Sequence, residues 1–245
     1  MNQYIDINCD LGEGFENEAD LMPYISSCSI ACGAHAGDEE IITKTINLAL
    51  QYDVKIGAHP SFPDRINFGR KVLDMTINDL KQSLKTQIML VKNKVESLGG
   101  KLNHVKAHGA LYNLSANHRE TAEALIEVVK NTTSQIFLYV PYGSVIETLA
   151  KQNGLKTKVE AFADRNYNTN LTLVSRSEHN AVITDPDLVA KHLLNIILDE
   201  QVISIDGIGV ELKAQTYCVH GDNPGVISIL KKVSKTLQEN GIKIV

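Results

Sequence analysis

The chain has 245 residues, of which 43% are hydrophobic and 22% are charged, and it carries a formal net charge of −5 at pH 7. A chain of this length can bury a large core within one β/α barrel, so we expect residues 1–245 to form a single domain. The acidic balance, without any block of lysine and arginine, argues against nucleic acid or an anionic membrane as a partner.

The first part of the chain predicts two strands, each followed by a loop that carries titratable residues. Tyr4–Cys9 alternates apolar and polar residues, as a strand does, and leads into Asp10. Glu13 stands between two glycines, whose backbone freedom permits a bend that brings this carboxylate back toward the strand end. Cys28–Cys32 predicts the second strand, and His35 follows it among small residues.

The next units follow the same pattern of strand, polar loop and capped helix. Asp38 is a favourable helix N-cap, and Val54–Ala58 predicts the third strand, which ends at His59. The loop 61–71 is long, and long loops in compact units are usually functional or mobile. Thr76 caps the most regular helix of the chain, in which apolar residues recur every three or four positions.

The fourth and fifth strands are predicted around Lys106, which precedes His108, and at Ile136–Val140. A helix is expected from about Asn117, and a short one over about 144–153. A lysine inside an apolar strand either has a lowered pKa or holds a substrate anion.

The last third of the chain predicts two more strands and an excursion outside the repeat. Lys158–Ala163 is the sixth strand, and 166–183 is a polar, poorly periodic excursion. Asp185 caps a helix, and Val202–Leu212 suggests a small hairpin. Thr216–Val219 is expected to be the last strand, with Asn223-Pro224 capping the final helix. The polar residues delivered by this part are Glu160, Asp164, Arg165, Arg176, His220 and Asp222.

Strand and helix thus alternate through about seven units, which favours a parallel sheet with outer helices. No Gly-x-Gly-x-x-Gly follows a strand, and this weakens a dinucleotide-binding, doubly wound interpretation. We therefore predict an α/β fold in the form of a single-domain β/α barrel.

The four cysteines and the N-terminal residues indicate the cellular compartment in which the protein is expected. The cysteines lack Cys-x-x-Cys spacing and three of them lie in apolar runs, so buried, reduced thiols are expected rather than a zinc site. The polar start of the chain is unlike a signal peptide, and no apolar run approaches the ~20 residues of a membrane span. We expect a protein of the reducing cytoplasm.

Four strand-end stretches carry a histidine, and in a parallel β/α fold these ends share the face where ligands bind. The residues expected on this rim are Asp10, Glu13, His35, His59, Lys106, His108, Glu160, Asp164, Arg165, His220 and Asp222. Such a set suits general acid/base catalysis on a small polar substrate. An aspartate and two histidines from separate strands would also form a divalent metal site, although the ligands are scattered and no His-x-x-x-His supports it. The nucleotide-binding pattern Gly-x-x-x-x-Gly-Lys-Ser/Thr is absent, so any nucleotide would be handled by another chain.

Six stretches carry a resemblance to a known family. They are Asp6–Glu13 (DINCDLGE), Ile30–Asp38 (IACGAHAGD), Ile56–Asp64 (IGAHPSFPD), His104–Asn113 (HVKAHGALYN), Glu160–Tyr167 (EAFADRNY) and Val219–Pro224 (VHGDNP). Together they resemble the LamB/YcsF family, which comprises the A subunit of the prokaryotic ATP-dependent 5-oxoprolinase. The resemblance implies a seven-stranded barrel related in shape to polysaccharide deacetylases. The chain departs from the family's usual pattern at Ala34, Ala107, Ser61-Phe62 and Thr169-Asn170.

The resemblance implies opening of the 5-oxoproline lactam to L-glutamate, coupled to hydrolysis of ATP, with Mg²⁺, by partner subunits B and C. Our hypothesis is that the partners activate the lactam oxygen and this chain opens the ring. The catalytic candidates are Asp10, Glu13, His35, His59, Lys106 and His108. Among them, an acid or a histidine would activate water, and His108 or His59 would protonate the leaving nitrogen. The substrate-binding candidates are Arg165, Arg176, Glu160, Asp164, His220 and Asp222.

Two other functions stay open at this point. One is a metal-dependent amide hydrolase or deacetylase that acts alone, with a divalent metal bound in the barrel. The other is a non-catalytic subunit that binds substrate and presents it to partners. The ligands of any metal and the oligomeric state, including a homo-oligomer, are not determined by the sequence.

Overall fold

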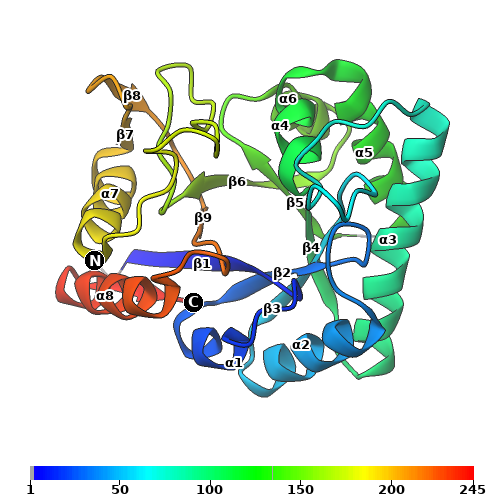
Figure 1. Ribbon diagram of the computed structural model, residues 1–245, viewed down its shortest axis with the longest axis horizontal. Coiled ribbons are helices and arrows are strands. Elements are labelled where there is room, and N and C mark those ends of the chain that lie inside the picture. The colour runs from blue at the N-terminus through cyan, green and yellow to red at the C-terminus, as the bar shows by residue number, and fades with distance from the viewer. Residues whose placement is uncertain (1–2, 134) are drawn as a thin grey trace.

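The computed structural model describes residues 3–133 and 135–245, and within them seven parallel strands close into a barrel (Figure 1). The strands are β1 (Gln3–Leu11), β2 (Ser27–Ala31), β3 (Lys55–His59), β4 (Leu102–Lys106), β5 (Phe137–Pro141), β6 (Lys156–Phe162) and β9 (Thr216–Cys218). The barrel closes because β9 pairs with both β6 and β1. The predicted seven-stranded β/α barrel is confirmed.

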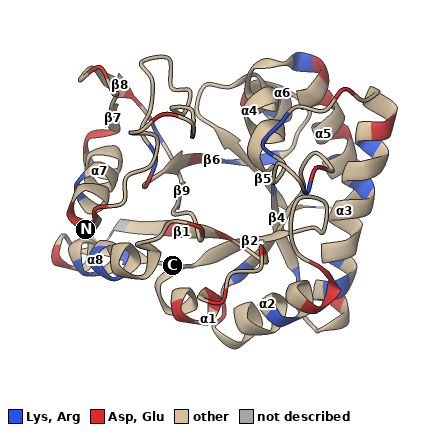
Figure 2. Ribbon diagram, in the orientation of Figure 1, with Lys and Arg blue, Asp and Glu red and all other residues tan. Residues whose placement is uncertain are grey.

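Helices surround this barrel (Figure 1). They are α1 (Glu18–Leu21), α2 (Glu39–Gln51), α3 (Ile77–Ser97), α4 (Gly109–Asn117), α5 (Arg119–Thr132), α6 (Val145–Gln152), α7 (Pro186–Asp199) and α8 (Val226–Glu239), with a 3₁₀ turn, η1 (Met22–Tyr24), after α1. Figure 2 shows both acidic and basic residues along each of α2, α3 and α8. Within the described residues, no helix combines the length and the apolar character that crossing a membrane requires.

Three predicted N-caps are confirmed by their hydrogen bonds. Asp38 accepts from the backbone of Ile41 at 2.9 Å, Thr76 accepts from Asp79 at 3.1 Å, and Asp185 accepts from the amides of residues 187 and 188. Each side chain satisfies amides that the first helical turn leaves unpaired.

The helix expected from about Asn117 is confirmed as α5, but α4 precedes it, so β4 is followed by two helices. Two other element predictions were wrong in detail. Asn223 does not cap α8, which begins at Val226 with Gly225 as its N-cap, because Asn223 Oδ1 accepts from the Gly225 amide at 3.2 Å, one residue before the helix. The Asn223 amide group donates to Asp164 and to the carbonyl of Ile183. β9 is not the last strand, since β10 (Ile242–Ile244) pairs in parallel with the start of β1.

The segment between β6 and α7 and the segment after α7 lie outside the barrel repeat, as predicted. An isolated antiparallel bridge between Arg165 and Val182 joins the two ends of the excursion 166–183, and a second one, between Tyr167 and Leu173, lies within it. β7 (Gln201–Ile203) and β8 (Gly209–Glu211) form the expected antiparallel hairpin. The four cysteines are buried free thiols, as expected.

The barrel interior is polar, because β1 presents every second side chain to strands across the barrel. Near its start, the Asp6 carboxylate accepts from Tyr139 on β5 at 3.1 Å. One layer higher, the Asn8 amide donates to Glu160 on β6 at 2.9 Å. At the top, Asp10 pairs with Lys106 on β4. The apolar core therefore lies between the outer face of the barrel and the helices.

Gly57 on β3 has to be a glycine because the His104 ring crosses it inside the barrel. A Cβ at Gly57 would lie 2.1 Å from Nε2 of His104. That ring is fully buried, stacks on Tyr139 at 4.0 Å between centroids and contacts the Ser29 hydroxyl at 3.2 Å. It therefore has no space into which to move.

We predict that Gly57→Ala lowers the free energy of unfolding by about 1–3 kcal/mol, because the added methyl overpacks the interior. Urea unfolding measures this. A double-mutant cycle with His104→Ala serves as the control. Without the His104 ring the added methyl has room, so Gly57→Ala should destabilise the His104→Ala variant less than it destabilises the wild type. An unchanged unfolding midpoint for Gly57→Ala would contradict the prediction.

Candidate active site

The floor of the site is built on the ammonium of Lys106, at the end of β4. Lys106 is 1% exposed, and its Nζ lies 2.7 Å from Glu160 Oε1 and 3.0 Å from Asp10 Oδ1. It also contacts Asn8 Oδ1 at 3.2 Å and Cys218 Sγ at 3.1 Å. An ammonium has three N–H donors, so these neighbours occupy all of them.

Burial disfavours the charge on Lys106, but the nearby carboxylates of Asp10 and Glu160 outweigh it and hold the pKa of Lys106 well above its usual value. The sequence-based alternative of a lowered pKa is therefore wrong. With its donors occupied, Lys106 is better placed to position Asp10 than to hold a substrate anion.

Asp10 connects this floor to the histidines. Its Oδ1 faces Lys106, and its Oδ2 lies 3.3 Å from Nε2 of His59 at the end of β3. Burial opposes ionisation of Asp10, yet His59 and Lys106 together lower its pKa well below the ordinary value. Asp10 is therefore a carboxylate at neutral pH.

Backbone carbonyls occupy one nitrogen of each of two adjacent histidines. His59 Nδ1 lies 2.8 Å from the carbonyl oxygen of Lys106, and His108 Nε2 lies 2.9 Å from that of Phe68. A carbonyl only accepts, so both nitrogens carry a hydrogen. The remaining nitrogens, His59 Nε2 and His108 Nδ1, lie 3.0 Å apart. Burial, with His35 and His59 nearby, lowers the pKa of His108 well below its usual value.

His35 and Glu13 form a second pair beside these histidines. The Ser61 hydroxyl donates to the carbonyl of Phe62 at 2.8 Å, so it accepts from His35 Nδ1 at 2.9 Å. His35 Nε2 is then an acceptor, and it lies 3.3 Å from Glu13 Oε1. Burial lowers the pKa of His35 to about 3, while burial, Asp10 and Asp222 raise that of Glu13 well above its ordinary value. A protonated Glu13 that donates to His35 satisfies this geometry.

The mouth of the site is positively charged. Asp222 Oδ2 lies 2.7 Å from Nη2 of Arg70, in the loop after β3, and 3.0 Å from Nη1 of Arg176, in the excursion. Two guanidinium groups thus share one carboxylate. The Arg70 and Arg176 side chains are 39% and 28% exposed, so both remain accessible to an anion.

Two predicted substrate-binding residues hold other parts of the wall in place. The Arg165 guanidinium donates to the carbonyls of Ala181 and Val174 at 3.0 and 2.6 Å, and so braces the excursion. The buried Asp164 accepts from both the ring and the backbone amide of His220, at 2.8 and 3.1 Å, which orients that ring.

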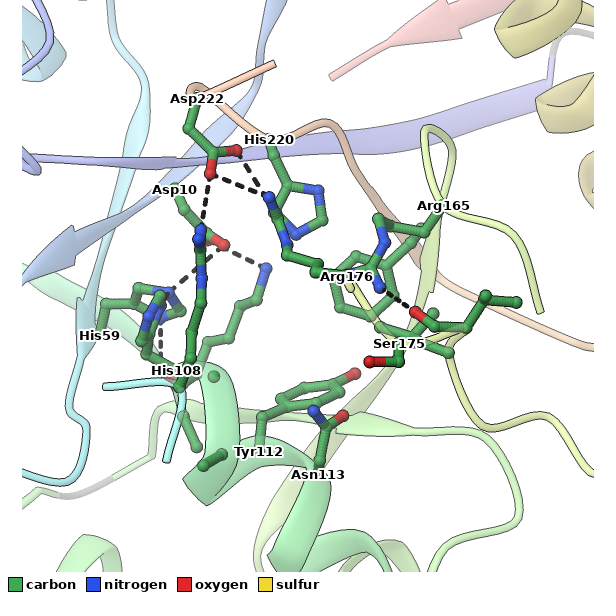
Figure 3. Close-up of a pocket in the computed structure, with 18 of the residues that line it drawn as sticks. Asp10, His59, His108, Tyr112, Asn113, Arg165, Ser175, Arg176, His220 and Asp222 are labelled. Atoms are coloured by element: carbon green, nitrogen blue, oxygen red, sulfur yellow. Dashed lines mark hydrogen bonds and ion pairs between the residues drawn. The ribbon is translucent and has the colours of Figure 1, made fainter. Parts of the chain in front are cut away.

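These residues surround a cavity of about 260 Å³ (Figure 3). The predicted residues that line it are Asp10, Glu13, His59, Lys106, His108, Arg165, Arg176, His220 and Asp222, whereas His35, Glu160 and Asp164 lie behind the lining. Tyr112, Asn113 and Ser175 form the opposite wall (Figure 3). These three and Arg70 were not among the predicted site residues, although Tyr112 and Asn113 lie in the family-like stretch His104–Asn113.

Two groups of potential metal ligands lie in the barrel. Glu13, His59 and His108 form one, and Asp10, Cys218 and His220 form the other; within each group the ligand atoms lie within 4.8 Å of one another. Nitrogen and carboxylate donors of this kind bind divalent transition metals.

Comparisons with known proteins agree with one another. Residues 5–245 match the LamB/YcsF family. The 5-oxoprolinase A subunit of Bacillus cytotoxicus is 38% identical over 243 residues, which cover 97% of this chain and 96% of that protein. The 5-oxoprolinase A subunit of Bacillus cereus is 39% identical over 246 residues, with 98% and 97% covered.

Solved structures support the same fold. The lactam utilization protein from Thermus thermophilus is 33% identical, with a TM-score of 0.92 over 99% of both chains. A peptidoglycan deacetylase from Bacillus subtilis has a TM-score of 0.44 and 13% identity over 100% of this chain and 88% of the other.

We predict that Lys106→Met lowers the free energy of unfolding by about 3–5 kcal/mol, because it leaves two buried carboxylates without their cation. Lys101→Met, at an exposed position, is the control and should change little. Adding Glu160→Gln to Lys106→Met should restore part of the loss. Equal unfolding midpoints for Lys106→Met and Lys101→Met would show that the ion pairs do not support the fold.

Proposed function

The chain belongs to the LamB/YcsF family, and we propose that it opens the lactam ring of 5-oxoproline to give L-glutamate, as the A subunit of an ATP-dependent 5-oxoprolinase. The observation that carries this proposal is a small polar cavity that combines the carboxyl groups of Asp10 and Glu13 with two accessible guanidinium groups, those of Arg70 and Arg176. In the reaction, water adds its oxygen to the amide carbon, the C–N bond breaks, and the ring nitrogen leaves as an amine after taking a proton.

The ATP requirement is assigned to partners. A five-membered lactam is resonance-stabilised and has little strain, so its carbonyl needs activation before water attacks. The chain lacks a P-loop, and a cavity of about 260 Å³ suits a small acid better than a nucleotide. We therefore place ATP and Mg²⁺ on subunits B and C. Four buried free thiols fit a reducing compartment, and we place the assembly in the cytoplasm.

The geometry supports a division of roles between Asp10 and Glu13. Asp10 is ionised and faces the cavity beside His59, so this pair accepts the proton of the attacking water. Glu13 carries a proton and lines the same cavity, so it protonates the leaving nitrogen. This revises the role first given to His108 or His59, because the N–H of each neutral imidazole donates to a backbone carbonyl, whereas the partner of Glu13 is a side chain, His35.

The substrate carboxylate binds at the mouth, between Arg70 and Arg176. These two residues replace Arg165 and Lys106 in the anion-binding role, because the donors of Arg165 and Lys106 are taken by backbone carbonyls and buried carboxylates. A carboxylate at the mouth directs the ring toward Asp10 and Glu13.

The decisive experiment measures glutamate release from 5-oxoproline by this chain alone and with candidate subunits B and C, with and without ATP. We expect activity only when the partners and ATP are both present. Activity of the chain alone that a chelator abolishes would replace the proposal with an independent metal hydrolase. A chain that binds 5-oxoproline while every variant of its cavity keeps full coupled activity would be a non-catalytic presenting subunit.

We predict that His59→Gln and Glu13→Gln each lower kcat of the coupled reaction by about 10²–10⁴-fold, as expected when proton transfer is lost. KM for 5-oxoproline should change much less. His179→Gln, at an exposed loop position, is the control and should keep full activity. Full activity in both cavity variants would refute the assigned proton transfers.

We predict that Arg176→Gln and Arg70→Gln raise KM for 5-oxoproline by about 10–100-fold, the size expected for a lost hydrogen bond to a charged group. The matched substrate is 2-pyrrolidinone, which has the same ring without the carboxylate. Its slower turnover should be unaffected by either substitution. If both substrates lose activity equally, the arginines do not recognise the carboxylate.

A further inference from the structure

Two buried imidazoles present bare nitrogens to one another at the cavity wall. Backbone carbonyls take the N–H of His59 at Nδ1 and the N–H of His108 at Nε2. In their neutral forms, the facing atoms His59 Nε2 and His108 Nδ1 are therefore both lone-pair acceptors, 3.0 Å apart. Two acceptors in contact repel each other, so this arrangement calls for a positive charge that both nitrogens share, either a proton on one imidazole or a metal ion.

The surrounding atoms complete a ligand set. Glu13 Oε1 lies 3.7 Å from His108 Nδ1, and Asp10 Oδ2 lies 3.3 Å from His59 Nε2. Two nitrogens bound tetrahedrally to one ion at ~2.1 Å would lie roughly 3.4 Å apart, so the observed spacing needs a shift of only a few tenths of an ångström. Glu13, His59 and His108 also line the cavity, so an ion there would be open to substrate.

The ligands are oriented before any ion binds. Metal-binding histidines usually donate their second N–H to a carbonyl or carboxylate, which fixes the tautomer, and both histidines here do so. The His108 ring stacks on His35 at 3.8 Å between centroids, and the rings are 4° from parallel. These contacts hold the two bare nitrogens in place.

The second ligand group of the barrel is less suited to a metal. Lys106 Nζ contacts both Asp10, at 3.0 Å, and Cys218, at 3.1 Å, so a fixed cation already occupies their centre. The first group has no such internal cation among the described residues.

We propose that His59 Nε2, His108 Nδ1 and the Glu13 carboxylate bind one divalent transition-metal ion, with Asp10 beside it. A donor set of two imidazoles and a carboxylate favours Zn²⁺, Co²⁺ or a similar ion over Mg²⁺, which prefers oxygen ligands. When bound, such an ion acts as a Lewis acid toward a carbonyl and activates water. The site shares Glu13 and His59 with the proton transfers assigned above, and a bound ion would replace the proton on Glu13, so its test measures metal binding and not turnover. It is distinct from the Mg²⁺ that accompanies a nucleotide.

The test uses the full-length chain without an affinity tag, stripped with a chelator and dialysed against Zn²⁺ or Co²⁺. We expect one ion per chain by elemental analysis, and Co²⁺ absorption bands typical of nitrogen ligation in a low-coordinate site. Millimolar Mg²⁺ should not displace either ion. A wild-type chain that retains no stoichiometric Zn²⁺ or Co²⁺ overturns the proposal without reference to any variant.

Variants locate the ion. His59→Gln and His108→Gln should weaken Co²⁺ binding at least about 100-fold, since even outer partners of a metal site are worth ~10–100-fold in affinity. His220→Gln removes a member of the second ligand group, and His179→Gln an exposed histidine; both should bind as the wild type does. Unchanged binding in the first two variants, or a loss in His220→Gln alone, would place the ion elsewhere. Unfolding curves of each variant separate lost ligation from lost structure.

Discussion

The structure depends on the ammonium of Lys106, whose positive charge lies inside the barrel and is balanced there by buried carboxylates. A buried cation is tolerated only when partners surround it, and these partners come from three other strands: Asp10 and Asn8 on β1, Glu160 on β6 and Cys218 on β9. One side chain of β4 therefore ties the register of the barrel to the position of the carboxylate that faces the cavity. Because the buried ammonium needs all of these partners around it, their positions are fixed, and the floor of the site is rigid as a result.

The polar layers below the floor follow from the same geometry. Because side chains alternate along a strand, Asp6, Asn8 and Asp10 all point inward, while Ile7 and Cys9 face the helices. Each inward polar group needs a partner across the barrel, and Ser26, Ser27 and Tyr139 supply those of Asp6. The barrel is thus held by hydrogen bonds inside and by apolar packing outside.

Much of this could be predicted from the sequence, because local patterns carry it. The alternation of apolar and polar residues in Tyr4–Cys9 indicated β1, and histidines after four apolar runs indicated a common rim. Other features depend on contacts between residues far apart in the chain. The raised pKa of Lys106 comes from Asp10 and Glu160, and the donors of Arg165 are taken by an excursion with no periodic pattern. β10 was missed because three residues next to the C-terminus, one of them lysine, carry too little pattern to indicate a strand.

The charged groups at the floor and at the mouth of the cavity carry excess charge of opposite sign. This difference favours one orientation of a bound anionic ligand. On the floor, one ammonium serves two carboxylates, Asp10 and Glu160, which leaves one unit of negative charge. At the mouth, one carboxylate, Asp222, serves two guanidinium groups, which leaves one unit of positive charge. An anionic group is attracted to the mouth and repelled from the floor, most strongly where the surroundings are least hydrated. A small ligand with a carboxylate at one end and a neutral amide at the other therefore has one favourable orientation, with the amide beside Asp10, Glu13 and the paired histidines. The same imbalance explains why the floor can accept a further cation next to Lys106: the excess carboxylate charge lies on that side of the cavity.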